Sequence, residues 1–233
     1  MIEIRQLFDP ETSTYTYLLW DPSTREAALV DPVREHVERD LKLVSELELR
    51  LAFVLETHVH ADHVTSAGLL ADRTGATTVA SALGAPCAVR HLADGESIQL
   101  GSNSIRAIAT PGHTRDSLSY YVDGHLFTGD ALLIRGTGRT DFQSGDAGQL
   151  YDAITEKLFT YSDTTKVWPG HDYRGQSSST VGEEKRCNPR LAGKTRDEFI
   201  EIMNGLALAP PKKIQQAVPA NLVCGRETQA LTA

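Results

Sequence analysis

Residues 57–63, Thr-His-Val-His-Ala-Asp-His, constrain this chain more than any other segment, because four of their side chains can bind a metal ion. They follow an apolar run at 51–55 that predicts a buried strand, and a helical pattern follows at 65–71. Side chains alternate along an extended backbone, so His58 and His60 are expected on the same side. A loop that is rich in histidine by chance is the alternative, but a cluster this dense is typical of a metal site, where a cation offsets the cost of burying it.

Later turns supply further ligand types in similar places. His113 and His171 each follow a strand-like run and stand directly after a Pro-Gly turn, and Asp130 follows a Gly at the end of another such run. The run before Asp130 contains Asp123-Gly124, which predicts a hairpin. Loops held by a rigid sheet are where functional sites are usually built. We therefore expect these three side chains to meet the 57–63 motif.

The remaining pattern indicates an α/β fold. Apolar spacing predicts helices over 37–49 and 149–159, and further helices are expected around 181–185 and 195–206. Residues 1–31 predict an N-terminal hairpin or meander.

This order of motifs resembles the metallo-β-lactamase superfamily over most of the chain. The resemblance implies a four-layer αβ/βα sandwich with the metal at one edge between two β-sheets. In the two-metal hydrolases of that superfamily, the positions that match one metal site here are His58, His60 and His113, those that match the other are Asp62, His63 and His171, and Asp130 bridges.

A narrower resemblance is to the persulfide dioxygenases, carried above all by Gly-Thr-Gly-Arg-Thr-Asp-Phe-Gln at 136–143. Further matching blocks lie at 169–173, 180–185, 188–191 and 217–221. The chain departs from that pattern at Thr137, where Cys is expected, and at Gly170, where Ala is expected.

The narrower resemblance implies a single iron held by His58, His113 and Asp130. The other four motif side chains would then form the hydrogen-bonded surroundings of the iron or the vestige of a second metal site; they are His60, Asp62, His63 and His171.

The implied activity is that of a non-haem iron(II) dioxygenase, with one Fe(II) per chain, that converts glutathione persulfide and O₂ to sulfite and glutathione. Two histidines and one carboxylate leave open positions on iron for substrate and O₂, and zinc lacks the redox chemistry. The alternative is a two-metal hydrolase of glutathione thioesters, of the glyoxalase II type, in which a metal-bound hydroxide attacks the carbonyl. Gly170 keeps this alternative open, whereas the short tail after Asn188 counts against it.

Glutathione carries two carboxylates, which arginine can bind through paired hydrogen bonds. The candidates for substrate binding near the site loops are Arg135, Arg139, Tyr173, Arg174, Lys185 and Arg186. Asp141 is expected to bind Arg139 or the loop backbone rather than the substrate.

Net charge and hydropathy restrict the classes of function that this chain can have. A net charge of −8 argues against nonspecific nucleic-acid binding. No apolar run approaches the length of a membrane span, and the N-terminus has no targeting pattern, so we expect a cytoplasmic protein that does not bind a membrane, as a possible homodimer. Residues 1–233 are expected to form a single domain with a short C-terminal extension from about 188.

Two residue types outside the motifs carry weaker expectations. The odd number of cysteines predicts reduced thiols rather than a disulfide, and they are Cys87, Cys187 and Cys224. The other histidines, His36, His91 and His125, are expected in helices or turns on the surface.

Overall fold

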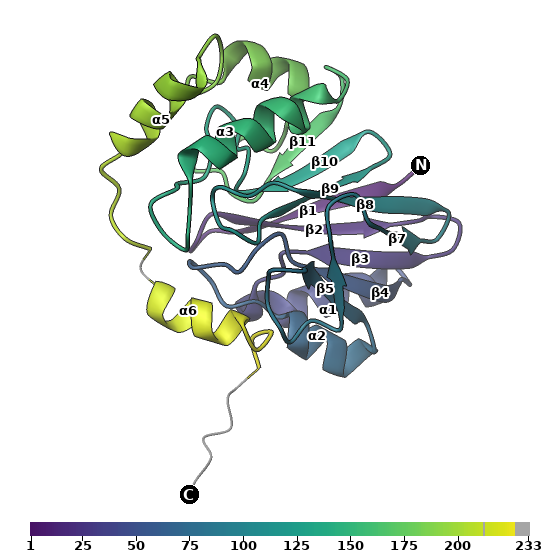
Figure 1. Ribbon diagram of the computed structural model, residues 1–233. Coiled ribbons are helices and arrows are strands. Elements are labelled where there is room, and N and C mark those ends of the chain that lie inside the picture. The colour runs from purple at the N-terminus through teal and green to yellow at the C-terminus, as the bar shows by residue number, and fades with distance from the viewer. Residues whose placement is uncertain (212, 227–233) are drawn as a thin grey trace, which may run out of the picture.

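The computed structural model describes residues 1–211 and 213–226. Within these residues, a pair of mixed β-sheets is stacked between two layers of helices. Helices α1 and α2 lie below the first sheet in Figure 1, and α3, α4 and α5 lie above the second. This arrangement confirms the expected four-layer αβ/βα sandwich.

The first sheet comes from the N-terminal half of the chain and has six strands. In spatial order they are β1 (Glu3–Asp9), β2 (Thr14–Trp20), β3 (Glu26–Val30), β4 (Arg50–Leu55), β5 (Thr77–Ser81) and β6 (Arg90–Leu92). The first two pairings are antiparallel and the others are parallel. The expected N-terminal hairpin or meander is present as β1, β2 and β3.

The second sheet also has six strands and is formed by later segments of the chain. In spatial order they are β12 (Ser179–Thr180), β11 (Lys166–Pro169), β10 (His125–Gly129), β9 (Leu118–Val122), β8 (Asn103–Ala109) and β7 (Ser97–Leu100). Strands β9 and β10 pair across Asp123-Gly124, which confirms the predicted hairpin, and β11 runs parallel to β10.

The helices lie close to their predicted positions. They are α1 (Val37–Glu46), α2 (Ala67–Thr74), α3 (Ala147–Glu156), α4 (Val181–Cys187), α5 (Arg196–Asn204) and α6 (Ile214–Asn221), with 3₁₀ turns η1 (Arg34–His36) and η2 (Leu158–Thr160). Side-chain oxygens that accept backbone N–H groups fix where three of them begin, namely Asp146, Thr180 and Thr195.

Three apolar clusters fill the spaces between the four layers. The central cluster joins the facing sides of the two sheets and includes Tyr17, Leu55, Tyr120 and Phe127, all at most 1% exposed. A second cluster joins α3 and α5 to the second sheet, and a third joins α1 and α2 to the first sheet. Both sheets are thus held rigidly, with their strand ends free to carry loops.

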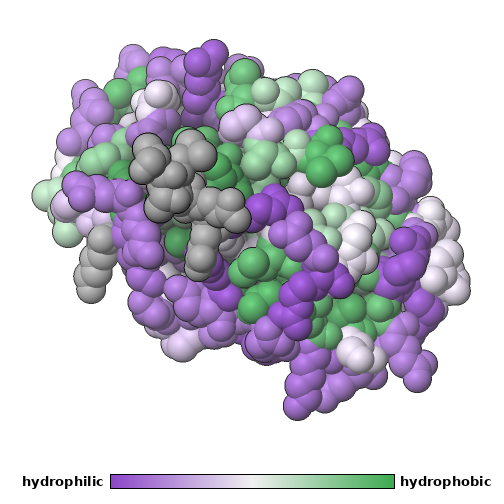
Figure 2. All heavy atoms as spheres, turned by 90° about the horizontal axis from the view of Figure 1, so that it is seen from below, coloured by the Kyte–Doolittle hydropathy of each residue, from purple (hydrophilic) through white to green (hydrophobic). Residues whose placement is uncertain are grey.

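The outer face that carries α1, α2 and α6 is shown in Figure 2, where hydrophilic residues surround smaller hydrophobic patches. Among the described residues, no helix combines the length and the apolar character needed to cross a bilayer.

Two expectations from the sequence were wrong. Cys87 and Cys224 form a disulfide, although they are 137 positions apart, and only Cys187 is a free thiol. His91 and His125 lie in β6 and β10 rather than in helices or turns, and the half-buried His125 accepts a hydrogen bond from the Trp168 indole. The disulfide escaped prediction because chain folding, not spacing, brings its two cysteines together.

Candidate metal centre

The motif side chains gather where strands of both sheets end. The 57–63 segment follows β4, His113 follows β8, Asp130 follows β10 and His171 follows β11. The strands therefore deliver these side chains to a common edge, as their positions in the sequence predicted.

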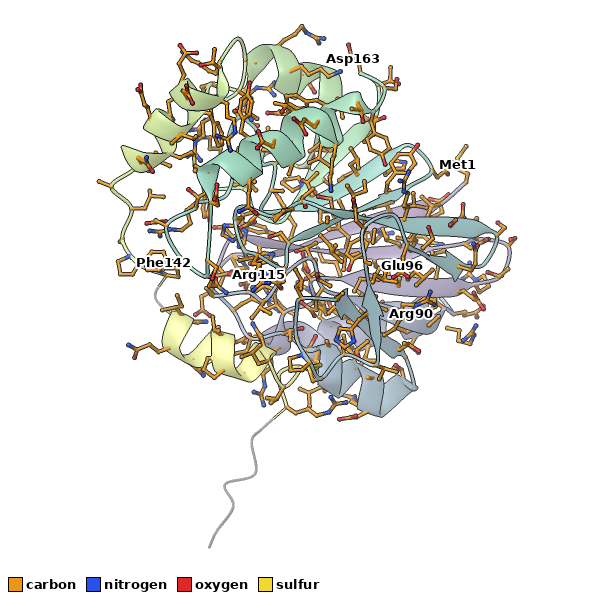
Figure 3. All side chains as sticks on the ribbon, viewed as in Figure 1. Met1, Arg90, Glu96, Arg115, Phe142 and Asp163 are labelled. Carbon is orange, nitrogen blue, oxygen red and sulfur yellow. A yellow bond between two sulfur atoms is a disulfide. The ribbon has the colours of Figure 1, made fainter. Side chains whose placement is uncertain are left out.

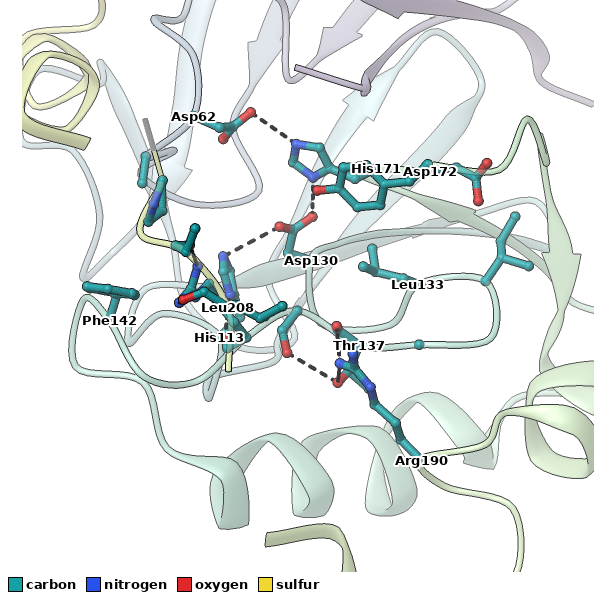
Figure 4. A pocket seen from close by; sticks show the side chains of 18 of the residues that line it. Asp62, His113, Asp130, Leu133, Thr137, Phe142, His171, Asp172, Arg190 and Leu208 are labelled. Carbon is teal, nitrogen blue, oxygen red and sulfur yellow. Dashed lines mark hydrogen bonds and ion pairs between the residues drawn. The ribbon is translucent and has the colours of Figure 1, made fainter. Parts of the chain in front are cut away.

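His58, His113 and Asp130 form a compact trio whose ligand atoms lie within 4.8 Å of one another. The Nδ1 atom of His58 lies 2.9 Å from the Thr57 hydroxyl, and Nδ1 of His113 lies 2.7 Å from the Arg139 carbonyl, to which it donates. Each imidazole therefore has its Nε2 left for a ligand position, and His113 Nε2 lies 3.6 Å from Asp130 Oδ2 (Figure 4). Hydrogen bonds to the second ring nitrogen of this kind orient metal-binding histidines.

The protonation states of His58 and Asp130 suit a cation. Burial, with the neighbouring His60 and His113, holds the pKa of His58 well below its ordinary value, so the ring is neutral and able to coordinate. Burial acts to raise the pKa of Asp130, but the surrounding histidines outweigh it and keep this pKa low, so the carboxylate is charged. Two imidazoles and one carboxylate form the donor set of non-haem iron sites.

The neighbouring residue Thr57 fixes the position of His58. The Asp31 carboxylate accepts hydrogen bonds from both the backbone N–H and the hydroxyl of Thr57, each at 2.7 Å. Gly129 has a φ of +49°, and a Cβ there would lie 2.6 Å from the Thr57 hydroxyl. Glycine at the end of β10 thus lets the two sheets approach closely beside the trio.

His171 lies between two carboxylates. Its Nδ1 is 2.6 Å from Asp130 Oδ1, and its Nε2 is 3.0 Å from Asp62 Oδ2. Burial lowers the pKa of His171, but the two carboxylates outweigh it and raise this pKa well above its ordinary value. Asp62 also contacts Nδ1 of His63 at 3.0 Å and the Thr14 hydroxyl at 3.1 Å. The donors of a second metal position are therefore paired with one another.

His60 lies beside His58, with ring centres 4.1 Å apart, but it contacts a different pair of carboxylates. Its Nε2 lies 3.1 Å from Asp31 Oδ1 and 3.4 Å from Glu56 Oε2. Burial lowers the pKa of His60, yet these carboxylates together raise it well above its ordinary value. The ligand atoms of His60 also lie within 4.8 Å of those of two other pairs, Asp31 with Glu56 and Asp62 with His63. His60 does not join the compact trio of His58, His113 and Asp130.

The two positions that depart from the expected pattern, Gly170 and Thr137, both lie at the site. A Cβ on Gly170 would lie 2.7 Å from Asp130 Oδ1, so glycine leaves this oxygen room to approach His171. The Thr137 hydroxyl is buried and accepts a hydrogen bond of 3.1 Å from Arg190.

A cavity of about 520 Å³ opens in front of Asp130 and His113. Its walls come from the 133–143 loop, from residues 171–174 and from the segment that joins α5 to α6. Figure 3 shows Phe142 beside this connecting segment. Both the loop and the segment, rather than the sheets, shape the space available to a substrate.

Arg139 lines the cavity, but its side chain is already engaged. It forms two hydrogen bonds with Asp141, of 2.6 and 2.7 Å, and donates to the carbonyls of Ala209 and Leu208. Its guanidinium carbon also lies 4.5 Å from the centre of the Phe142 ring. The expected contact with Asp141 is present, and Arg139 holds the 208–211 wall in place.

The other predicted substrate-binding residues divide into two groups. Tyr173 and Arg174 line the cavity; Tyr173 is 72% exposed and its ring stacks on His171. Arg135 lines it as well, but its guanidinium is bound to Glu183 and the buried Glu184.

The structure does not bring Lys185 and Arg186 into the cavity. Both lie on α4, and Lys185 pairs with Asp163 at 2.8 Å. This corrects their expected place beside the substrate.

Sequence reasoning missed Arg190 as a residue of the cavity wall. It lines the cavity, burial lowers its pKa, and its NH1 group donates to the Thr137 carbonyl at 2.7 Å (Figure 4). Within the described residues, no carboxylate pairs with its guanidinium. The available signal was its place in the Asn-Pro-Arg-Leu block at 188–191.

Comparison with known proteins agrees with this geometry. The family model described as the metallo-beta-lactamase superfamily matches residues 9–171. The bovine and human proteins named persulfide dioxygenase ETHE1, mitochondrial, are 48% and 47% identical over 97% of this chain and 89% and 90% of their own length. The crystal structure of ETHE1 from Myxococcus xanthus is 56% identical, covers 96% of this chain and 100% of its own, and superposes with a TM-score of 0.95.

Proposed function

The chain belongs to the metallo-β-lactamase superfamily and, within it, to the persulfide dioxygenases, and we propose that it oxidises glutathione persulfide with O₂ at a single Fe(II). Membership of this family makes it an oxidoreductase. One persulfide, one O₂ and one water balance to one glutathione and one sulfite.

The trio of His58, His113 and Asp130 would hold the iron. Its donor set fits Fe(II), which supplies the redox chemistry and the open positions that a reaction of O₂ with sulfur needs. The residues around it keep the ligands in place: the Arg139 carbonyl orients His113, and Thr57 orients His58.

The main support for a single metal is the resemblance to relatives named persulfide dioxygenases, and the pairing of the other donors agrees with it. Asp62 contacts both His63 and His171, and His171 also contacts Asp130. A hydrolase with two metals would use these same side chains as ligands. The glyoxalase II alternative is not favoured, since the relatives that match nearly the whole chain are named persulfide dioxygenases.

Arg190 is our candidate for binding a carboxylate of the thiol carrier. It is a half-buried cation in the cavity wall with no described carboxylate partner, so a substrate carboxylate would compensate its charge. Tyr173 and Arg174 stand at the exposed side of the same cavity, where they can contact the remainder of the carrier.

The proposal is tested by metal content and O₂ uptake. After anaerobic loading with Fe(II), we expect about one iron per chain and O₂ consumption that needs glutathione persulfide. Glutathione alone should be inert, because a thiol has no sulfane sulfur to oxidise. The proposal fails if the protein holds two zinc ions per chain, hydrolyses S-lactoylglutathione rapidly and takes up no O₂.

We predict that Arg190→Ala weakens persulfide binding more than it slows turnover. Losing a hydrogen bond to a charged group costs about 1.5–3 kcal/mol, which corresponds to a KM roughly ten- to a hundredfold higher. Arg186→Ala is the matched control, since this arginine lies on α4 outside the cavity. Steady-state O₂ uptake on folded, iron-replete protein gives both constants; equal KM values for the two variants would remove Arg190 from the binding site.

The proposal also covers the location, the domain organisation and the oligomeric state of the protein. We expect the protein to act in the cytoplasm and to form a single domain over residues 1–233 with a short C-terminal extension from about 188; a homodimer is the oligomeric state to test. Size-exclusion chromatography with light scattering tests the last point.

A further inference from the structure

The loop that carries the metal motif depends on the side chain of Asn221. Residues 56–64 lie outside the helices and strands, and much of this segment is buried, so its backbone groups need other partners. Asn221 is 3% exposed and supplies three of them. Its Nδ2 donates to the carbonyls of His60 and His63, both at 2.9 Å, and its Oδ1 accepts from the N–H of Thr65 at 2.8 Å.

The turn after α6 is pressed against the same loop. A Cβ on Gly225 would lie 1.9 Å from the Thr65 carbonyl oxygen, and the φ of Gly225 is +68°. The N–H of Gly68, in the first turn of α2, donates to the Cys224 carbonyl at 2.8 Å. Close backbone contact of the residues that follow Asn221 thus fixes where its amide reaches the loop.

A covalent bond fastens this turn to the first sheet. Cys224 is bonded to Cys87, which lies between β5 and β6 and is partly accessible to solvent. Cys87 Sγ also lies 3.8 Å from the Asn221 carbonyl oxygen. The disulfide therefore acts three residues from the side chain that holds the metal loop.

We propose that Asn221 is a positioning residue for the metal centre and that the Cys87–Cys224 disulfide makes its hold on the loop sensitive to thiols. With the disulfide formed, the turn after α6 is fixed and Asn221 keeps the 60–65 backbone in the arrangement that places His58 beside His113 and Asp130. With the disulfide reduced, the turn loosens and metal affinity falls. This inference rests on the proposed metal trio but not on the identity of the sulfur substrate.

The reduction is a balanced exchange with a monothiol, the chemical class to which the proposed product belongs. One thiolate attacks the accessible Cys87 sulfur, the S–S bond breaks, and Cys224 leaves as a thiolate that takes up a proton. A second thiol attacks the mixed disulfide and releases Cys87 as a thiol and the monothiol as its disulfide. The two external thiols are oxidised by two electrons in total, and the protein disulfide is reduced by two. A disulfide inside a cytosolic protein is usually of this redox-sensing kind.

The test measures how fast a bound metal leaves. Protein loaded with Co(II) or Fe(II) is mixed with excess chelator, with and without prior anaerobic reduction by a monothiol that is then removed. We expect reduced wild type to release metal about tenfold faster, within the range that loss of outer partners of metal ligands produces. The double variant Cys87→Ser/Cys224→Ser should release metal at that fast rate under both conditions, whereas Cys187→Ser should behave as wild type.

The role of Asn221 has its own comparison. Asn221→Ala should lower metal affinity about 10–100-fold, and hydrogen exchange of the 60–65 amides should rise while that of β8 and β9 stays unchanged. Gln215→Ala, at an exposed position on the same helix, should change neither.

Each outcome decides a separate point. If oxidised wild type binds no metal, the proposed centre is wrong. Hydrogen exchange of the 60–65 amides, compared between oxidised and reduced protein, then still tests whether the disulfide holds this loop. Equal metal release by oxidised protein, reduced protein and the double variant would overturn the thiol-sensitive device. Three reactive thiols in aerobically purified protein would do the same.

Discussion

Metal binding is expected to disappear in Asp130→Ala and in His113→Ala. Each change removes one member of the trio that lies within 4.8 Å, and a site with three protein ligands holds iron weakly once one is lost. Asp130→Ala also takes away the carboxylate that His171 contacts at 2.6 Å, so it leaves that buried imidazole partly unpaired. Turnover should fall to background in both variants.

Asp62→Ala and His171→Ala are expected to lose less metal and less activity than Asp130→Ala and His113→Ala. These side chains contact the trio or one another without belonging to it, so most of the iron should stay and activity should fall about 10–100-fold. In a hydrolase with two metals, the same changes would remove one metal and nearly all turnover. Iron content and initial O₂ uptake are measured for all four variants, with folding checked by circular dichroism. Complete metal loss from Asp62→Ala or His171→Ala would contradict the single-metal assignment.

The strand ends that carry the trio could be predicted because their signals are local, whereas the choice of these three side chains and the four-layer architecture came from the family resemblance. The apolar runs before the 57–63 motif, His113 and Asp130 each predicted a strand that ends at a ligand, and the structure has β4, β8 and β10 there. Strand pairing brings the ends of β8, β10 and β11 to one edge of the second sheet, and stacking of the two sheets brings the end of β4 beside them.

The features that sequence reasoning missed depend on contacts between distant segments. Sequence reasoning chose Lys185 and Arg186 rather than Arg190, because which of these cations enters the cavity depends on how the chain turns after α4. Arg139 was correctly placed at the cavity, but its contacts with the carbonyls at 208 and 209 cross about 70 residues of sequence. The Cys87–Cys224 bond crosses 137.

The last prediction concerns two glycines of one loop. In Gly138→Ala, the added Cβ would lie 2.3 Å from the Asp130 carbonyl oxygen and 2.8 Å from Nδ1 of His113, closer than real Cβ atoms approach. Either the His113 ring or the backbone at Asp130 must shift, and both carry ligands of the trio. A displacement of about 1 Å at a reacting centre costs on the order of 100-fold in rate. We therefore expect Gly138→Ala to lose metal and about that much activity, although no ligand is changed.

Gly136→Ala is the matched control, two positions away. The nearest atom to its added Cβ is Leu133 Cβ at 3.9 Å, and its φ lies outside the left-handed region, so alanine fits without strain. Metal content, melting temperature and O₂ uptake should match the wild type. Measuring both variants separates displacement of the ligands from a general effect of stiffening the loop. If Gly138→Ala retains its metal and activity, or if Gly136→Ala loses both, the close approach of this loop to His113 does not set the geometry of the centre.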